Sequence, residues 1–282
     1  MIEAHISLVD PCEIKGFIPI DASWFLPTSS RNAHQEYLQK RIPGARFFDL
    51  EKCSRDSIYP HMLPEPKQFS ETMHQLGIQN SDHIVIYDSL GMFSSPRVWF
   101  TFKYFGHENV HLLNGGLSAY IESNLPLESS TTDPSFKVSD YPIPTPNTNW
   151  IADYQDVMKV AVGQSESIII DARPHERWSG VSPEPRPGIP SGHIPHSISV
   201  PFSKLLINGK YRNKQDLMQV FANSNVDMNR TLITSCGSGI SACVDLVGLL
   251  LVGKKDVKLY DESWTGYVHP TRAGGNPELI QK

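Results

Sequence analysis

The segment that most constrains this chain is TLITSCGSGISACVDLVGLL, residues 231–250. The β-branched apolar run at 232–234 predicts a buried strand of a parallel sheet. A loop of small residues, 237–241, follows Cys236, and the segment after it is apolar on almost every side from Ala242 onward. That pattern predicts a helix buried under the sheet, so the segment is expected to fold as strand, tight loop and helix.

Such an arrangement directs backbone N–H groups and the positive end of a helix dipole at the residue in the loop. Here that residue is Cys236, and a thiol in such a position has a lowered pKa because its thiolate is stabilised. A free cysteine is more often a small buried hydrophobe, a description that fits Cys243. Cys236 lies instead at the carboxyl end of a strand, where α/β sheets place their ligands. Reactive thiolate and inert packing both stay open on this evidence.

The two halves of the chain resemble one another at an offset of about 150 residues, as a duplicated domain would. Each half has a short apolar strand that ends in an aspartate, then an Ile-Pro turn that leads into a second short strand, then an apolar strand before a loop, then a final strand. The matched pairs are IPIDAS (18–23) with IIIDAR (168–173), RIPGARFF (41–48) with HIPHSISV (193–200), HIVIYDSLG (83–91) with TLITSCGSG (231–239), and VHLLNGGLSAY (110–120) with VKLYDESWTGY (257–267).

Strands alternate with helical patterns throughout, so the expected fold class is α/β, with two domains that are each a mostly parallel sheet covered by helices on both faces. The Pro/Ser/Thr-rich stretch 126–149 is the expected linker between a first domain, 1–125, and a second, 150–282. Asp88 stands in the first half where the second has Cys236. A carboxylate would repel an anion there, so the first domain is expected to be non-catalytic and to form one wall of the site.

Three arginines, Arg173, Arg177 and Arg186, lie in the Pro- and Gly-rich segment before the second Ile-Pro turn. Ion pairs with neighbouring acids would account for any one of them. Arginine also binds carboxylates and oxyanions with two parallel hydrogen bonds. Because the α/β topology brings this loop to the sheet edge of Cys236, Arg177 and Arg186 are candidates for binding an anionic substrate. His61, alone in a Pro-bounded loop, gives no such signal.

Composition excludes several function classes. The net charge is −5 and no basic block is present, so neither nucleic acid nor a membrane surface is an expected partner. The four cysteines, Cys12, Cys53, Cys236 and Cys243, have no regular spacing, which argues against a disulfide framework and a metal site. The N-terminus has no secretory signal pattern. We expect a cytoplasmic protein, with the mitochondrion as a second location, and no cofactor.

Several of these segments resemble the tandem-domain rhodanese-like sulfurtransferases. The resemblance rests on CGSGIS at Cys236, on DAR, RWSG and PEPRPGIPSGHIP before it, and on FFDL, PHMLP and SSPRVW in the first half. In that family, thiosulfate sulfurtransferases usually carry basic residues after the cysteine. The 3-mercaptopyruvate sulfurtransferases have Cys-Gly-Ser-Gly, an aliphatic residue and Thr, and this chain resembles that group with Ser241 in place of Thr. It also resembles fungal members that supply sulfur for tRNA thiolation.

The resemblance implies a mechanism in which the Cys236 thiolate attacks the sulfur of 3-mercaptopyruvate, releases pyruvate and becomes a persulfide. Arg177 and Arg186 then occupy the positions that bind the substrate carboxylate and carbonyl. The other substrate-binding positions are in the loop, at Gly237, Gly239, Ile240 and Ser241. Ser238 and His61 match the serine and histidine of a proton relay. Its acid is either Glu51 or Asp49, because the spacing departs from the family pattern.

The resemblance also implies that the persulfide passes its sulfur to a thiol acceptor such as thioredoxin. Two alternatives remain: a thiosulfate sulfurtransferase, and a sulfur carrier fed by a cysteine desulfurase. A phosphatase is disfavoured because Ala242 replaces the arginine of a Cys-x5-Arg loop. Segment 260–267 departs from the family's pattern at Glu262 and Gly266, and we interpret it as structural.

Overall fold

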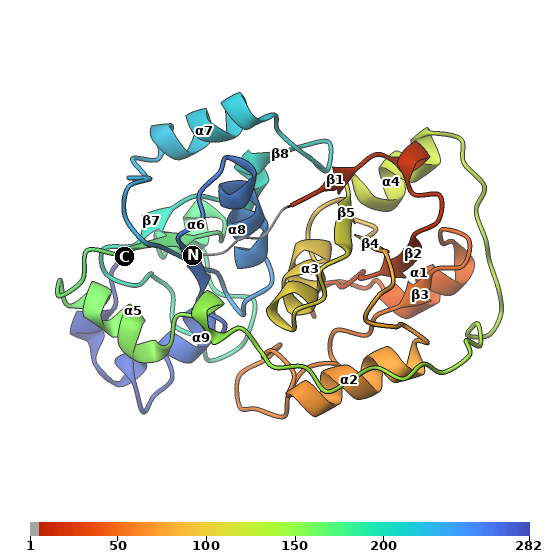
Figure 1. The fold of residues 1–282 in the computed structure, drawn as a ribbon. Helices are drawn as coiled ribbons and strands as arrows, with labels where there is room; N and C mark the ends of the chain where they lie inside the picture. Colours follow the sequence, from red (N-terminus) through yellow and green to blue (C-terminus); the bar gives the residue numbers. More distant parts are fainter. Residues whose placement is uncertain (1–5) are drawn as a thin grey trace.

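The computed structural model describes residues 6–282 and contains two parallel β-sheets joined by an extended segment (Figure 1). In the first sheet the strands lie in the order β1-β5-β4-β2-β3, and every neighbouring pair is parallel. Its strands are β1 (Leu8–Val9), β2 (Ile18–Asp21), β3 (Arg46–Phe47), β4 (Ile84–Tyr87) and β5 (Val110–Leu113). Its helices are α1 (Ala33–Gln39), α2 (Pro66–Gln75), α3 (Ser95–Tyr104) and α4 (Gly116–Glu122).

The second sheet has the strand order β11-β10-β6-β7, again with parallel neighbours. Its strands are β6 (Ile168–Asp171), β7 (Ile198–Ser199), β10 (Leu232–Ser235) and β11 (Val257–Leu259), and a small hairpin is formed by β8 (Leu206–Ile207) and β9 (Lys210–Tyr211). Its helices are α5 (Tyr154–Ala161), α6 (His175–Trp178), α7 (Lys214–Asn223), α8 (Ala242–Leu251) and α9 (Ser263–Tyr267). Short 3₁₀ turns span Pro11–Glu13, Thr148–Trp150, Phe202–Leu205, Ala273–Gly275 and Pro277–Leu279.

The two sheets confirm the duplication. The order β5-β4-β2-β3 in the first half corresponds, strand for strand, to β11-β10-β6-β7 in the second. The outer strand β1 also has a counterpart, because Ile151 makes a parallel bridge to Leu259 of β11. In each sheet the strand that precedes the loop of interest is central, with β4 between β5 and β2 and β10 between β11 and β6. The loops that follow these strands therefore lie at the middle of a carboxyl edge, where parallel sheets bind ligands.

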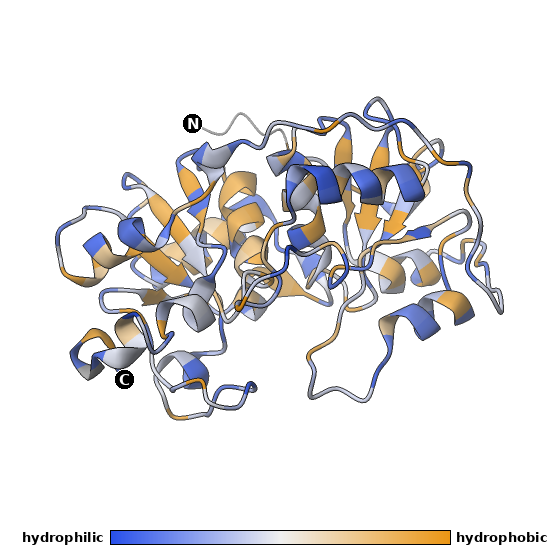
Figure 2. Cartoon of the chain, turned by 90° about the horizontal axis from the view of Figure 1, so that it is seen from below, coloured by the Kyte–Doolittle hydropathy of each residue, from blue (hydrophilic) through white to orange (hydrophobic). Residues whose placement is uncertain are grey.

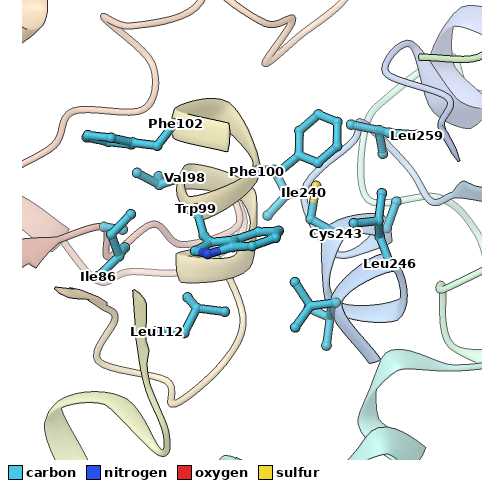
Figure 3. Close-up of a cluster of buried hydrophobic side chains, with 14 of the residues drawn as sticks. Ile86, Val98, Trp99, Phe100, Phe102, Leu112, Ile240, Cys243, Leu246 and Leu259 are labelled. Atoms are coloured by element: carbon cyan, nitrogen blue, oxygen red, sulfur yellow. The ribbon is translucent and has the colours of Figure 1, made fainter. Parts of the chain in front are cut away.

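Helices α3 and α8, which follow the two matched loops, pack against each other between the sheets. Figure 3 shows Trp99 and Phe100 of α3 facing Cys243 and Leu246 of α8. All four side chains are fully buried and belong to one hydrophobic cluster that extends through both domains. Burial of this cluster couples the two domains, because separating them would expose large aromatic side chains to water.

Smaller clusters cover the outer faces of the two sheets. Residues of α1 and α4 pack on the first sheet, and residues of α5 and α9 pack on the second. Hydrophobic residues accordingly concentrate on the strands and inner helices, whereas outer helices and loops carry hydrophilic residues (Figure 2). In the described part of the chain, no helix is long and apolar enough to span a membrane.

Asp245 on α8 is a polar side chain inside this core. It is fully buried, and neither carboxyl oxygen has a hydrogen-bond partner within residues 6–282. Burial raises the pKa of Asp245 well above its ordinary value, and the negative charges of Asp171 and Cys236 act in the same direction. The carboxyl group is therefore held in its neutral form, at a cost in stability.

We predict that Asp245→Val raises the free energy of unfolding by about 1–3 kcal/mol, the usual cost of a buried polar group without a partner. The unfolded chain releases this proton above about pH 4 while the folded chain retains it, so the parent loses stability as the pH rises from there. The advantage of Asp245→Val should thus grow from pH 4 to pH 7 in urea denaturation. Asp245→Asn, whose side chain has a similar shape, should remove the pH dependence of stability but raise the free energy of unfolding less than Asp245→Val does. A less stable valine variant with an unchanged pH profile would show that the carboxylate is paired.

Candidate active site

Cys236 lies directly after β10 and before α8, as the sequence predicts, and it is 2% exposed. The loop that follows depends on Gly239, which has a φ of +80°. A Cβ atom on Gly239 would lie 2.7 Å from the carbonyl oxygen of Asp261, so no other residue fits there without displacing the backbone. In the described part of the chain the N–H groups of Ser238, Ile240 and Ser241 have no backbone acceptor. These donors are free to bind an anion at the loop.

Ser263 holds the start of this loop in place. Its Oγ accepts hydrogen bonds from the N–H groups of Cys236 and Gly239, both at 3.1 Å, and donates to the carbonyl of Tyr260 at 2.9 Å. The same oxygen lies 3.9 Å from Cys236 Sγ. The N–H of Gly239 therefore points to Ser263 and not to a ligand, which differs from the role that the family resemblance implied for it. Ser263 has a φ of +51°, a strained conformation of the kind that clusters at functional sites.

His61 reaches this loop from the first domain. Its Nδ1 lies 3.0 Å from Ser238 Oγ, and its Nε2 lies 2.9 Å from Glu51 Oε1. An ionised carboxylate only accepts, so we assign the ring proton to Nε2 and the lone pair to Nδ1. The hydrogen bond from His61 lowers the pKa of Glu51 to about 2, which keeps it ionised. Ser238, His61 and Glu51 thus form a chain of proton donors and acceptors across the two domains.

Glu51, and not Asp49, is the acid in contact with His61, so the structure decides between the two candidates. Asp49 pairs with Lys52 at 3.2 Å. Trp24 also supports Glu51, because its Nε1 donates to Glu51 Oε1 at 2.7 Å. Its ring lies edge-on to the His61 ring with centroids 4.8 Å apart. Trp24 thereby fixes both members of the pair.

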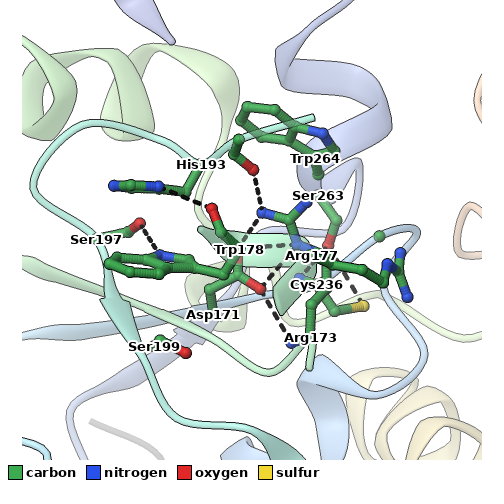
Figure 4. A network of polar contacts seen from close by, with 12 residues as sticks. Asp171, Arg173, Arg177, Trp178, His193, Ser197, Ser199, Cys236, Ser263 and Trp264 are labelled. Carbon is green, nitrogen blue, oxygen red and sulfur yellow. Dashed lines mark hydrogen bonds and ion pairs between the residues drawn. The ribbon is translucent and has the colours of Figure 1, made fainter. Parts of the chain in front are cut away.

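The three arginines of the second-domain loop have different surroundings. Arg173 is 1% exposed and pairs with Asp171 at 2.6 Å and with Glu184 at 2.7 Å, which makes it a structural residue (Figure 4). Arg177 also pairs with Glu184, and its Nη2 lies 3.2 Å from where a Cβ on Gly237 would be, so it contacts the cysteine loop.

Arg186 is partly buried and, among the described residues, forms no ion pair within 4.0 Å. Its Nη2 lies 3.5 Å from His61 Nδ1. Burial lowers the pKa of Arg186, while the negative charges of Cys236 and Glu51 oppose that shift. Arg186 is therefore the loop arginine whose charge is available to an anion beside Cys236.

A buried arginine of the first domain connects these parts. Arg97, on α3, lies 2.6 Å from the carboxylate of Asp261, donates to the carbonyl of His61 at 2.6 Å and donates to the carbonyl of Gly239 at 3.3 Å. Asp261 also accepts the N–H of Leu63 at 2.8 Å. His61 has a φ of +60°, and its bond to Arg97 helps to hold that strained conformation. Arg97 thus fixes His61 and the cysteine loop relative to each other.

The matched loop of the first domain binds its own carboxylate. Oδ2 of Asp88 accepts hydrogen bonds from the backbone N–H groups of Phe93, Ser94 and Ser95 at 2.8–3.0 Å, and Oδ1 accepts that of Leu90 at 2.8 Å. The Ser95 hydroxyl donates to Oδ2 as well. The donors that could bind an external anion are therefore occupied by a side chain.

The family resemblance predicted that Cys236, Ser238 and His61 act together and left the acid open between Glu51 and Asp49, but the sequence did not identify Arg97, Asp261, Ser263 or Trp24. Arg97 lies inside the SSPRVW motif, but nothing in that motif indicates a role for it. Ser263 lies in the segment interpreted as structural, and its contacts with Cys236 show that this segment also positions the site. The described residues contain no group of three or more His, Cys, Asp or Glu side chains that could hold a metal ion.

We predict that Arg97→Met, which leaves Asp261 buried without a cation, lowers the free energy of unfolding by about 3–5 kcal/mol. Asp261→Asn should cost a similar amount, and the double variant should lose much less than the sum. Chemical denaturation of the four proteins in a double-mutant cycle measures this coupling. Additive losses would show that the two side chains do not stabilise each other.

Comparison with known proteins agrees with this geometry. The rhodanese-like domain family matches residues 29–123 and 155–269. The probable 3-mercaptopyruvate sulfurtransferase of Schizosaccharomyces pombe is 42% identical over 88% of this chain and 85% of its own length. The human 3-mercaptopyruvate sulfurtransferase is 40% identical over 87% of this chain and 82% of its own length.

The crystal structure of Tum1 protein from Saccharomyces cerevisiae superimposes with a TM-score of 0.90 at 33% identity, covering 98% of each chain. The two family matches fall one on each parallel sheet and account for the duplicated topology. The chain belongs to the rhodanese-like family, as a member with two rhodanese domains.

Proposed function

We propose that this protein is a sulfurtransferase that takes sulfur from 3-mercaptopyruvate on Cys236 and passes it to a thiol acceptor. The observation that carries the proposal is the assembly of Cys236 with Ser238, His61 and Glu51 beside the guanidinium of Arg186, which forms no ion pair among residues 6–282. A nucleophile, a proton relay and a cation for the substrate carboxylate are thus brought together. The names of the relatives at about 40% identity support the same donor.

In the proposed first step, the Cys236 thiolate attacks the donor sulfur. A new S–S bond forms, the C–S bond breaks, and its electron pair remains on carbon as the enolate of pyruvate. The donor's thiol proton passes to Ser238 Oγ as Ser238 gives its own proton to the lone pair of His61 Nδ1, and the reverse transfer then delivers a proton from Ser238 to that carbon. The products are the Cys236 persulfide and pyruvate, so atoms and charge balance. The free N–H groups of Ser238, Ile240 and Ser241 are proposed to stabilise the charge on the outer sulfur.

Arg186 is proposed to bind the donor carboxylate, because its charge is not neutralised by a neighbouring acid. Arg177 is proposed to act at the carbonyl of the donor. Its ion pair with Glu184 holds it against Gly237, so it is oriented before substrate arrives. Orientation of this kind lowers the entropic cost of reaching the transition state.

The first domain is proposed to contribute His61 and Glu51 without a catalytic centre of its own. Its loop carries Asp88, whose carboxylate occupies the backbone donors that follow β4. An anionic substrate would meet that negative charge in place of a nucleophile.

Thiosulfate is the main alternative donor, and a specific observation disfavours it. Thiosulfate carries two negative charges, and the loop Gly237 to Ser241 contains no lysine or arginine to bind the second one. Thiosulfate should therefore be a poor substrate. The acceptor is proposed to be a thiol such as that of thioredoxin. The alternative is that the protein relays sulfur for tRNA thiolation and receives it from a cysteine desulfurase. We propose that the protein is located in the cytoplasm, with the mitochondrion as a second location.

We predict that brief exposure to 3-mercaptopyruvate adds the mass of one sulfur atom to the parent protein, and that a peptide map places it on Cys236. Cys236→Ser should gain none. Cys243→Ser is the matched control and should be labelled normally, because burial raises the pKa of Cys243 to about 12 and keeps that thiol unreactive. A Cys236→Ser protein that still gains sulfur would refute the mechanism.

Glu51→Gln should lower kcat about 10- to 100-fold with little change in KM, a smaller loss than the roughly 10²- to 10⁴-fold of a group that transfers the proton itself, because Glu51 acts through His61. Glutamine keeps the length of the side chain but cannot hold the His61 ring with a full negative charge. Asp49→Asn, a nearby acid that contacts Lys52, should retain parental rates in the same steady-state assay of pyruvate release. Equal losses in both variants would assign the effect to the local structure and not to the relay.

A further inference from the structure

The two domains differ at one buried position that the proposed chemistry does not use. In the second domain, Arg173 follows the Asp171 that ends β6. Its guanidinium bonds the Asp171 carboxylate and the carbonyl of Gly192, and it stacks 4.7 Å from the centre of the Trp264 ring (Figure 4). Together with Glu184, which pairs with Arg173 at 2.7 Å, these three groups enclose an arginine side chain that is almost completely buried.

The first domain keeps the aspartate but lacks the arginine. In the matched segments, Asp21 corresponds to Asp171 and Ser23 to Arg173. The turn is the same, because the N–H of Ser23 donates to Asp21 Oδ1 at 2.9 Å and that of Arg173 donates to Asp171 Oδ1 at 3.0 Å. Leu117 corresponds to Trp264, so a smaller side chain also replaces the indole. Two large groups are therefore missing around the same carboxylate.

A cavity of about 370 Å³ occupies this place. Asp21, Ser23 and Leu117 line it, and so does Lys40, which corresponds to Gly192. The counterparts of Asp171, Gly192 and Trp264, three of the four groups that contact Arg173, therefore line the first-domain cavity; the fourth group is Glu184. Tyr37 and Ile121 add an aromatic and an aliphatic wall.

Asp21 has no cationic partner in the described part of the chain. Its side chain is 1% exposed and interacts with Ser23 and Tyr87, which are neutral donors. Burial raises the pKa of Asp21 to about 6, and the negative charge of Asp88 adds to that effect. Arg31 also lines the cavity but is paired with Glu36 at 2.6 Å. A buried carboxylate without a cation is stabilised by a positively charged ligand more than by water.

We propose that this cavity binds a small guanidinium compound, with Asp21 as its counter-ion. The ligand takes the place that the Arg173 side chain fills in the second domain: its planar group meets the Asp21 carboxylate with two parallel hydrogen bonds, and its carbon atoms lie against Leu117 and Tyr37. The cavity is separate from the Cys236 site, so the proposal does not depend on the donor used there.

The test measures binding of methylguanidinium and of L-arginine to the full chain by ligand-observed NMR at constant ionic strength. We expect saturable binding with a Kd on the order of 1 mM or tighter for at least one of the two. Thermal unfolding in the same ligand should shift upward with concentration, as mass action requires. Methylammonium, which cannot form the two parallel bonds, should bind at least several-fold more weakly.

Two variants locate the site. Ser23→Arg introduces the side chain that Arg173 supplies in the second domain, so the cavity is filled by the protein itself. This variant should not bind the ligand, and its midpoint of thermal unfolding without ligand should be higher than that of the parent. Asp21→Asn should abolish binding by removing the counter-ion, and it decides the question if Ser23→Arg does not fold. Asp140→Asn, an exposed acid in the linker, is the matched control and should bind normally. Absence of saturable binding to the parent, or binding that survives Asp21→Asn, would overturn the proposal.

Discussion

The buried ion pair between Arg97 and Asp261 is the interaction on which the rest of the site depends. Arg97 comes from the first domain and Asp261 from the second, and both are almost completely buried. Burial acts to lower the pKa of Arg97, but the Asp261 carboxylate and Cys243 together raise it above its ordinary value. The same guanidinium bonds the carbonyls of His61 and Gly239. A single side chain therefore sets the distance between the proton relay and the nucleophile's loop.

The two duplicated domains differ at the carboxyl edges of their sheets in how polar groups are paired. Backbone donors follow the central strand in each domain. In the first they bind the Asp88 carboxylate, whereas in the second they remain free beside Cys236. The aspartate that ends β2 or β6 diverged as well, because Asp171 has a buried arginine and Asp21 has none. At both positions, the polar groups of one domain are paired within the chain, and those of the other domain are left for a ligand.

Local patterns were sufficient for most of the fold. The β-branched strand before Cys236, the apolar helix after it and the offset between the halves predicted two related domains, each with a parallel sheet. The site was only partly predictable, because the residues that complete it meet across the domain interface. Nothing near His61 in the sequence indicates that Arg97 holds its carbonyl. The choice between Glu51 and Asp49 likewise depended on the path of the intervening loop, and the role of Ser263 depended on a left-handed turn in a segment that had no catalytic signal.

The central claim is that a nucleophile from the second domain works with a relay from the first, with Arg186 as the cation for the donor. A crystal structure of the protein soaked briefly with 3-mercaptopyruvate and then frozen tests this most directly. The account predicts density for one additional sulfur on Cys236 Sγ, pyruvate with its carboxylate on Arg186, and Ser238 still in contact with His61 Nδ1. Sulfur on another cysteine, or pyruvate bound away from Arg186 with His61 turned out of the site, would contradict it.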